Sequence, residues 1–147
     1  MDVSESEEVR ALLREYAASL PFELDFQDFD RELAGLPGAY APPRGALLLA
    51  RIDGEAAGCI ALRPFAEDVC ELKRLFVRPA ARGLGLGRRL TTEIVSEARR
   101  LGYARMRLDT TPGMEAAQAL YEELRFVETA PYRHNPVPGT RFLELEL

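Results

Sequence analysis

The amino-acid sequence predicts an α+β fold with a mixed, mostly antiparallel sheet flanked by about four helices. Two observations lead to this class. The first half of the chain carries two helical patterns and then a meander of three strand patterns, two of which are joined by a hairpin signal. The second half alternates strand and helix, which makes the sheet mixed rather than purely antiparallel.

The bulk composition fits one globular domain over residues 1–147, because 47% of the residues are apolar and 29% are charged. No long apolar run indicates a membrane span, and the acidic N-terminus lacks the layout of a secretion signal. We therefore expect a cytoplasmic protein with no membrane partner. The net charge of −5 argues against a nucleic-acid partner, since such binding depends on neutralising phosphates.

Two helices are predicted before the first strand. Ser4 and Glu7 have capping-box spacing ahead of a helix over 9–20 that ends at Pro21. A second amphipathic helix is predicted over 25–36. A surface loop follows, because its adjacent prolines, Pro42 and Pro43, disfavour regular structure.

The remaining elements follow from alternation, turn residues and helical spacing. Asp53 and Gly54 predict a tight hairpin between the first two strands. A glycine-rich loop precedes the third helix, and Gly102 is expected to cap that helix. The predicted segments are strands over 46–52, 55–63 and 69–77, a helix from about 87 to 101, a strand over 104–110, a helix over 114–126, a short strand and a terminal strand.

The loop from Val77 to Leu90, VRPAARGLGLGRRL, places glycines at alternate positions immediately before a helix. A helix start presents unpaired amides and a partial positive charge, and glycine lets the backbone approach an anion closely. Four arginines add charge to this segment: Arg78, Arg82, Arg88 and Arg89. The loop therefore predicts a phosphate site; the alternative is a flexible turn with solvated arginines.

Two well-known phosphate motifs do not fit this loop. A P-loop has Lys followed by Ser or Thr after its last glycine, whereas Arg88 and Arg89 follow Gly87. A dinucleotide-binding loop that began at Gly83 would need glycine at the sixth position, which is Arg88.

The residues Arg82-x-x-Gly85-x-Gly87 resemble the Q/R-x-x-G-x-G/A signature of the GNAT superfamily of acetyl-CoA-dependent N-acyltransferases. The later segment AAQALYEELRF is similar to a second signature of that superfamily. Its matching positions are Ala117, Leu120, Tyr121, Leu124 and Phe126. The resemblance extends through nearly the whole chain and implies a GNAT-like acyl-CoA N-acyltransferase fold.

The sequence departs from the family pattern at three points. Met114 stands where the second signature usually has asparagine, and Arg125 stands where it usually has glycine. The strand that usually precedes the first helix is absent or very short.

The resemblance implies acetyl-CoA as co-substrate, a primary amine of a small molecule or peptide as acceptor, direct attack in a ternary complex, and no metal. Loop amides would hold the pyrophosphate, the third strand would accommodate the pantetheine arm, and a free amide near Leu75 would stabilise the developing oxyanion. The cofactor-binding residues expected on this basis are Leu75, Phe76, Val77, Arg82, Gly83, Leu84, Gly85, Leu86, Gly87 and Arg88.

The same resemblance implies two catalytic residues. Glu71 matches a position where many family members keep a glutamate as base; the alternative is a strand charge paired with Lys73 or Arg74. Tyr121 matches the tyrosine often assigned as acid to the coenzyme sulfur; the alternative is core packing.

The acceptor side is less defined. Tyr40, Pro42–Pro43 and residues 132–135, which include His134, occupy segments that line the acceptor cleft in related folds. Glu67, Asp68 and Asp109 could attract a cationic amine or serve only as surface charges. The terminal strand offers an edge for a homodimer.

The two cysteines, Cys59 and Cys70, fall on adjacent predicted strands and are expected to stay reduced in the cytoplasm. Without neighbouring histidines they form no zinc site. Two other functions remain open: a catalytically silent acyl-CoA sensor, and an acyltransferase with a covalent Cys70 intermediate.

Overall fold

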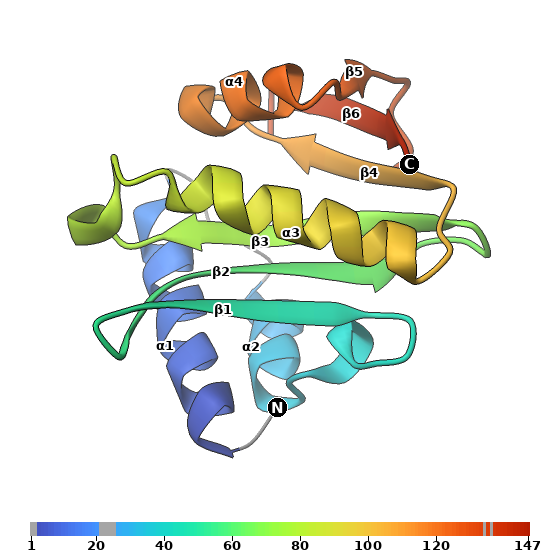
Figure 1. Cartoon of the computed structure of the whole chain (residues 1–147). Helices are drawn as coiled ribbons and strands as arrows, with labels where there is room; N and C mark the ends of the chain where they lie inside the picture. The colour runs from blue at the N-terminus through green and yellow to red at the C-terminus, as the bar shows by residue number, and fades with distance from the viewer. Residues whose placement is uncertain (1–2, 21–25, 134, 136) are drawn as a thin grey trace.

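The structure is a computed structural model that describes residues 3–20, 26–133, 135 and 137–147 (Figure 1). Pro21 and His134, which carried sequence-based expectations, lie outside these ranges. In chain order the elements are α1 (Val3–Ser19), α2 (Phe26–Ala34), the short helix η1 (Gly38–Tyr40), β1 (Ala46–Ile52), β2 (Glu55–Pro64), β3 (Val69–Val77), the short helix η2 (Pro79–Ala81), α3 (Leu86–Arg100), β4 (Arg105–Thr110), α4 (Glu115–Glu123), β5 (Val127–Glu128) and β6 (Arg141–Glu146).

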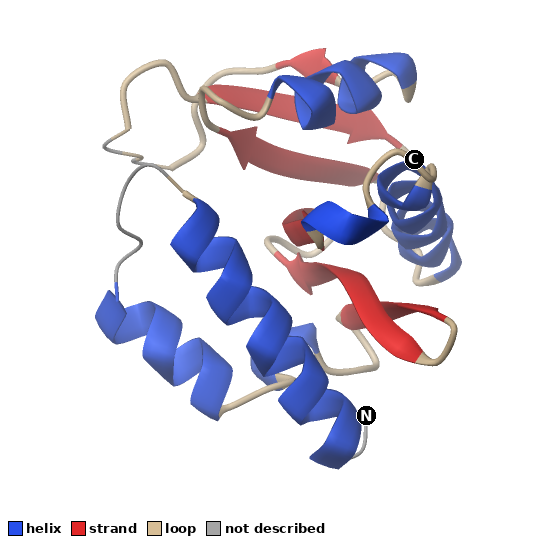
Figure 2. Cartoon of the chain, turned by 90° about the vertical axis from the view of Figure 1, so that its left-hand side faces the viewer, coloured by secondary structure: helices blue, strands red, loops and turns tan. Residues whose placement is uncertain are grey.

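The strands form one six-stranded sheet in the order β1-β2-β3-β4-β6-β5. Only β3 and β4 pair in parallel, over 69–71 and 105–107, and every other neighbouring pair is antiparallel. Helices α1 and α2 lie on one side of the sheet and α3 lies on the other (Figures 1 and 2). The predicted α+β class with a mixed, mostly antiparallel sheet is therefore confirmed.

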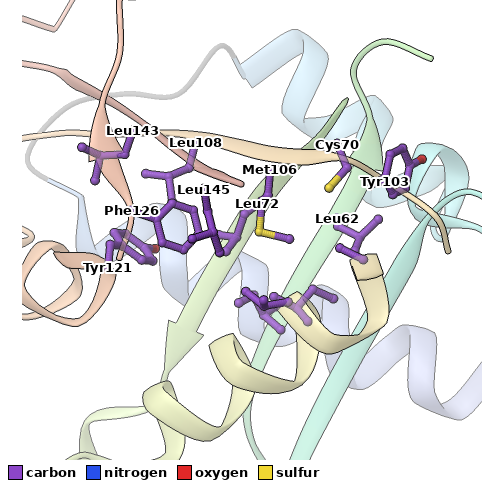
Figure 3. Close-up of a cluster of buried hydrophobic side chains, with 14 of the residues drawn as sticks. Leu62, Cys70, Leu72, Tyr103, Met106, Leu108, Tyr121, Phe126, Leu143 and Leu145 are labelled. Atoms are coloured by element: carbon purple, nitrogen blue, oxygen red, sulfur yellow. The ribbon is translucent and has the colours of Figure 1, made fainter. Parts of the chain in front are cut away.

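Each face of the sheet has its own apolar core. On one face α3 buries the stripe Leu90, Ile94 and Ala98, which the helical spacing predicted. The same cluster includes Tyr121 and Phe126 at the end of α4, which lie together in Figure 3. On the other face α1 and α2 pack against β2 and β3 through the side chains of Val9, Leu12, Leu13, Phe29, Leu33, Cys59, Ala61 and Phe76.

A β-bulge at Arg74 kinks β3 in the middle of the sheet. Ala61 pairs with Lys73 and Cys59 pairs with Phe76, so two residues of β3 face one residue of β2. Arg74 takes a φ of 62°, a left-handed conformation that is unfavourable for a residue with a Cβ. Its guanidinium donates to both carboxylate oxygens of Glu32 on α2, at 2.8 and 3.0 Å. This tertiary ion pair stabilises the kink.

The bulge changes which side chains share a face. Ala61 belongs to the α1/α2 core, and Lys73 lies directly opposite it on the same face of the sheet. Because of the extra residue, Arg74 also turns toward this face and contacts Phe29 with its guanidinium 5.3 Å from the ring centroid. Two consecutive cationic side chains thus lie on one side of β3.

Several predicted boundaries were wrong. Helix α1 begins at Val3, so Ser4 lies inside the helix and is not its N-cap. Helix α4 ends at Glu123 rather than at 126, because the chain turns left-handed at Arg125. The terminal strand β6 is not the expected edge of the sheet, since it lies between β4 and β5. Homodimerisation stays a prediction, but β6 does not provide the sheet edge that was expected to mediate it.

The two cysteines lie on adjacent strands, as predicted, but they point to opposite faces. Cys59 belongs to the α1/α2 core and Cys70 to the α3 core. Both thiols are free, and the sheet between them rules out a disulfide.

Arg125 lies just after helix α4, at a position whose backbone conformation favours glycine. The amide of Arg125 donates to the carbonyl of Glu122, and the amide of Phe126 donates to the carbonyl of Tyr121, both at 3.0 Å. These bonds form a Schellman ending, in which the residue after the helix is left-handed, and φ of Arg125 is 75°. This left-handed φ explains why the family usually has glycine at this position.

We predict that Arg125→Gly raises the free energy of unfolding by about 1 kcal/mol, because glycine adopts this φ without steric cost. Urea unfolding measures the change. Arg125→Ala is the matched control, since it removes the exposed guanidinium but keeps the Cβ, and it should leave stability nearly unchanged. An equal gain in both variants would assign the effect to charge rather than to φ.

Candidate active site

The central cavity opens where β3 and β4 separate. The two strands pair only over 69–71 and 105–107, so the β4-facing edge of residues 72–77 has no ladder partner (Figure 1). A cavity of about 640 Å³ lies here, a volume typical of a small-molecule site. Its walls are the second half of β3, residues 81–87, the end of β4 and the first half of α4.

The glycine loop supplies unpaired amides to one end of this cavity. Gly83 and Gly85 have φ values of 83° and 76°, and the N-cap of α3 is Gly85, which has no capping side chain. Within the part of the chain that the structure describes, the amides of residues 83–88 make no hydrogen bond. Donors of this kind at a helix start suit a diphosphate. The loop therefore fits the pyrophosphate of coenzyme A.

The four arginines of the loop do not contribute equally. Three of them form ion pairs: Arg78 with Glu15, Arg88 with Glu123, and Arg89 with Glu93. Arg82 instead donates from Nε to the carbonyl of Val77 at 3.0 Å, and among the described residues it has no carboxylate partner. Arg82 is therefore the cation of this group that is most available to an anion.

Most of the predicted coenzyme-binding residues border the cavity, and two do not. Leu75, Phe76 and Val77 lie along its β3 wall, and the loop contributes Arg82, Gly83, Gly85, Leu86 and Gly87. Leu84 points to solvent with 68% of its surface exposed, and Arg88 turns toward Glu123. At these two positions only the unpaired backbone amide is left for the predicted coenzyme contact.

Tyr121 lies in the cavity wall at the end of α4, where only 5% of it is exposed. Its ring packs against Phe126 with centroids 5.5 Å apart (Figure 3). The hydroxyl makes no hydrogen bond to any described residue, and burial raises the pKa of Tyr121 above its ordinary value. This hydroxyl therefore keeps its proton at neutral pH.

Glu71 is completely buried and does not border the cavity. Its carboxylate accepts hydrogen bonds from Arg63 and from the Tyr132 hydroxyl, each at 2.9 Å, and it forms an ion pair with Arg133. The partners are therefore Arg63 and Arg133, rather than Lys73 or Arg74 as in the alternative considered from the sequence. The base function of Glu71 stays a prediction.

On the acceptor side, one of the three predicted acidic residues reaches the cavity. Asp109 borders it and accepts a hydrogen bond from Asn135 Nδ2 at 3.1 Å, whereas Glu67 and Asp68 lie away from it. Tyr40 is buried in the α1/α2 core. Sequence reasoning did not identify Lys73 as a site residue, although this side chain also borders the cavity.

A split sheet with unpaired loop amides at one end of its cavity agrees with the acyl-CoA N-acyltransferase fold that the sequence resemblance implied. The sequence profile of the acetyltransferase (GNAT) family matches residues 7–126. The chain belongs to the GNAT family of acetyltransferases and is an acetyl-CoA-dependent N-acetyltransferase.

Relatives and solved structures agree with this assignment. The chain is 42% identical to an uncharacterised N-acetyltransferase of Schizosaccharomyces pombe, over 96% of this chain and 88% of that protein. It superimposes on a GNAT acetyltransferase from Staphylococcus aureus with a TM-score of 0.84 and 21% identity, covering 99% and 95% of the two chains. A proposed acetyltransferase from Salmonella typhimurium, solved with its cofactor acetyl-CoA, gives a TM-score of 0.76 and 18% identity over 99% and 90%.

Two further observations concern membrane-spanning helices and metal-binding clusters among the described residues. None of the helices among them is long and apolar enough to span a membrane. No group of three or more His, Cys, Asp or Glu side chains among them could hold a metal ion.

We predict that Cys59 and Cys70 do not react with a thiol reagent in the folded protein at pH 8, because burial raises the pKa of each thiol to about 12. Both should react once urea unfolds the chain, and the folded rate should rise with pH as thiolate forms. A disulfide-exchange assay with an aromatic disulfide measures this. Rapid labelling of Cys70 in the folded state would instead support the covalent route.

Proposed function

We propose that this protein transfers the acetyl group of acetyl-CoA to a primary amine by direct attack in a ternary complex. One observation supports the proposal: the glycine loop with its unpaired amides, the free edge of β3 and the side chain of Tyr121 all border one cavity. We also propose that residues 1–147 act as one domain. The cytoplasmic location stays a prediction.

The loop and the strand would hold the two parts of the coenzyme. Amides at the start of α3 supply hydrogen bonds and a positive dipole end to the diphosphate. The free edge of residues 75–77 offers main-chain donors and acceptors to the amide groups of the pantetheine arm, as a neighbouring strand would. Alignment of amine and thioester in this cavity would supply much of the rate.

Tyr121 is the group that we propose protonates the departing thiolate. Its hydroxyl borders the cavity, is free of other hydrogen bonds to described residues, and is protonated at neutral pH. Glu71, the base predicted from the sequence, would have to act from outside the cavity wall, because its carboxylate is enclosed by Arg63, Tyr132 and Arg133.

Two departures from the family signature, Met114 and Arg125, favoured the alternative of a catalytically silent sensor, and one of them lies away from the cavity. Arg125 departs from the family signature at an exposed helix end and does not border the cavity, so its effect is on the backbone. Met114 does border the cavity and is the remaining departure that could affect the coenzyme. Thiol release with an amine library separates the two functions, since a sensor would bind acetyl-CoA and release thiol only at the rate of hydrolysis.

We predict that the double variant Arg82→Glu with Gly85→Asp weakens acetyl-CoA binding by about 10- to 100-fold, because it places two negative charges beside the diphosphate. Aspartate tolerates the left-handed conformation of Gly85, so the fold should persist. Calorimetry measures the affinity. Arg89→Glu is the control, since Arg89 pairs with Glu93 outside the cavity. Undiminished binding in the double variant would remove the loop from the site.

We predict that Tyr121→Phe lowers kcat by about 10²- to 10⁴-fold and leaves acetyl-CoA affinity unchanged, because the ring packing against Phe126 remains while the proton donor is lost. Steady-state kinetics and calorimetry measure the two quantities separately. A variant with the full kcat would reduce Tyr121 to a packing residue.

A further inference from the structure

Lys73 is the one lysine of the chain, and it lies in the cavity wall immediately after β3 and β4 separate. Lys73 comes just before the bulge and pairs with Ala61, so regular strand alternation turns its side chain to the α1/α2 side of the sheet. Asp109, on β4, borders the same cavity. An amine and a carboxylate thus lie on opposite walls of the gap in the sheet.

The ammonium of Lys73 has no committed partner. It makes no hydrogen bond or ion pair with the described residues, and the neighbouring carboxylates are already held: Glu71 by Arg63 and Arg133, Glu32 by Arg74, and Asp109 by the Asn135 amide. The charged groups around Lys73 are Glu71 and Arg74 on β3, Asp109 on β4, Arg133 in the loop before β6 and Glu32 on α2.

This environment favours the neutral amine. Half-burial of the side chain is the largest effect, and it lowers the pKa of Lys73 to about 8. The nearby guanidiniums of Arg74 and Arg133 lower it further, whereas Glu71 and Asp109 oppose them. A base whose pKa is close to the working pH is an effective proton acceptor, since it is partly neutral before the reaction and holds the proton afterwards.

The other titratable groups of the cavity are less suited to this step. Burial raises the pKa of Tyr16 and of Tyr121, so both are proton donors rather than acceptors at neutral pH. Arg74 and Arg82 carry guanidiniums, which are hydrogen-bond donors and not proton acceptors. Asp109 offers carboxylate oxygens that can hold an ammonium group. Glu115 also borders the cavity, and its carboxylate accepts a hydrogen bond from the Gly113 amide at 3.3 Å. Among these cavity groups Lys73 alone carries an amine.

We propose that Lys73 is the general base of the transfer and takes the proton from an acceptor ammonium held between Lys73 and Asp109. This inference rests on the proposed function. The acceptor ammonium gives one proton to the neutral amine of Lys73, and the freed nitrogen forms a bond to the thioester carbon. The carbon–sulfur bond breaks, the thiolate gains a proton from Tyr121, and the amide nitrogen loses its second proton, which restores Tyr121. Lys73 then releases its proton to solvent.

Labelling tests the proton affinity of Lys73 without any activity measurement. Because the chain has a single lysine, protein grown with ¹³C-lysine shows one side-chain ε-carbon signal, which reports the titration directly. We expect a midpoint near 8 in the full-length protein. A midpoint above about 10, the value of an exposed lysine, would overturn the proposal.

Kinetics then test the base role. Lys73→Met removes the amine, and Lys73→Arg keeps the positive charge but cannot release a proton at neutral pH. We expect both variants to lose about 10²- to 10⁴-fold in kcat/KM and to lose the rise in kcat/KM toward pH 8, with acetyl-CoA affinity unchanged. Activity retained in Lys73→Arg would overturn the proposal, because a charge that anchors the acceptor would then suffice.

Glu71→Gln distinguishes the two candidate bases. We expect this variant to keep a rise in kcat/KM with pH, with its midpoint moved to lower pH, because Glu71 favours the protonated form of Lys73. If that rise disappeared in Glu71→Gln and persisted in Lys73→Met, the base would be Glu71. Failure of the proposed function would look different: wild-type protein would bind acetyl-CoA but release no thiol with any amine.

Discussion

The ion pair between Arg74 and Glu32 is the contact on which the site depends. It holds a residue with a Cβ in a left-handed conformation at the centre of a sheet, where a regular strand would otherwise continue. The resulting bulge lies in the stretch of β3 that follows the last parallel pair, Glu71 with Arg107, and that has no ladder partner on the β4 side. The kinked strand and its free edge together form one wall of the cavity.

The two ends of the cavity that we propose for the coenzyme and for the acceptor are built differently. At the coenzyme end the loop offers main-chain amides, which are fixed in position and do not titrate. At the proposed acceptor end the cavity wall carries charged side chains, and Arg74 and Asp109 among them are held by Glu32 and Asn135. Lys73 differs from this pattern because it lies among these charges without a partner in the described chain. Main-chain amides thus suit the binding of a coenzyme that a whole family shares, whereas side chains suit the binding of a particular acceptor.

Local signals in the sequence were sufficient for most of the fold. Asp53–Gly54 predicted the hairpin, the stripe of Leu90, Ile94 and Ala98 predicted the buried face of α3, and the glycines predicted an open loop before α3. Each of these features is set by residues close together in the chain. The family resemblance added the acyl-CoA assignment, which composition and spacing alone did not provide.

The features that sequence reasoning missed are set by distant contacts. The partner of Arg74 is 42 residues away, and Arg133, which pairs with Glu71, is 62 residues away. No local sequence pattern in β3 predicts a bulge. Strand alternation alone therefore could not show that Lys73 and Arg74 share a face of the sheet. The position of β6 inside the sheet likewise depends on the return of β5, a strand of only two residues.

Apart from Lys73 and one histidine, every basic residue of the chain is an arginine. This has a chemical consequence for a protein that handles thioesters. Guanidinium groups remain protonated in water and do not attack acyl donors, whereas exposed lysine amines can. With its single lysine in the cavity wall, the molecule has an outer surface whose positive side chains resist stray acylation. Prolonged exposure to reactive acyl donors would leave its surface charge intact, apart from the amino terminus.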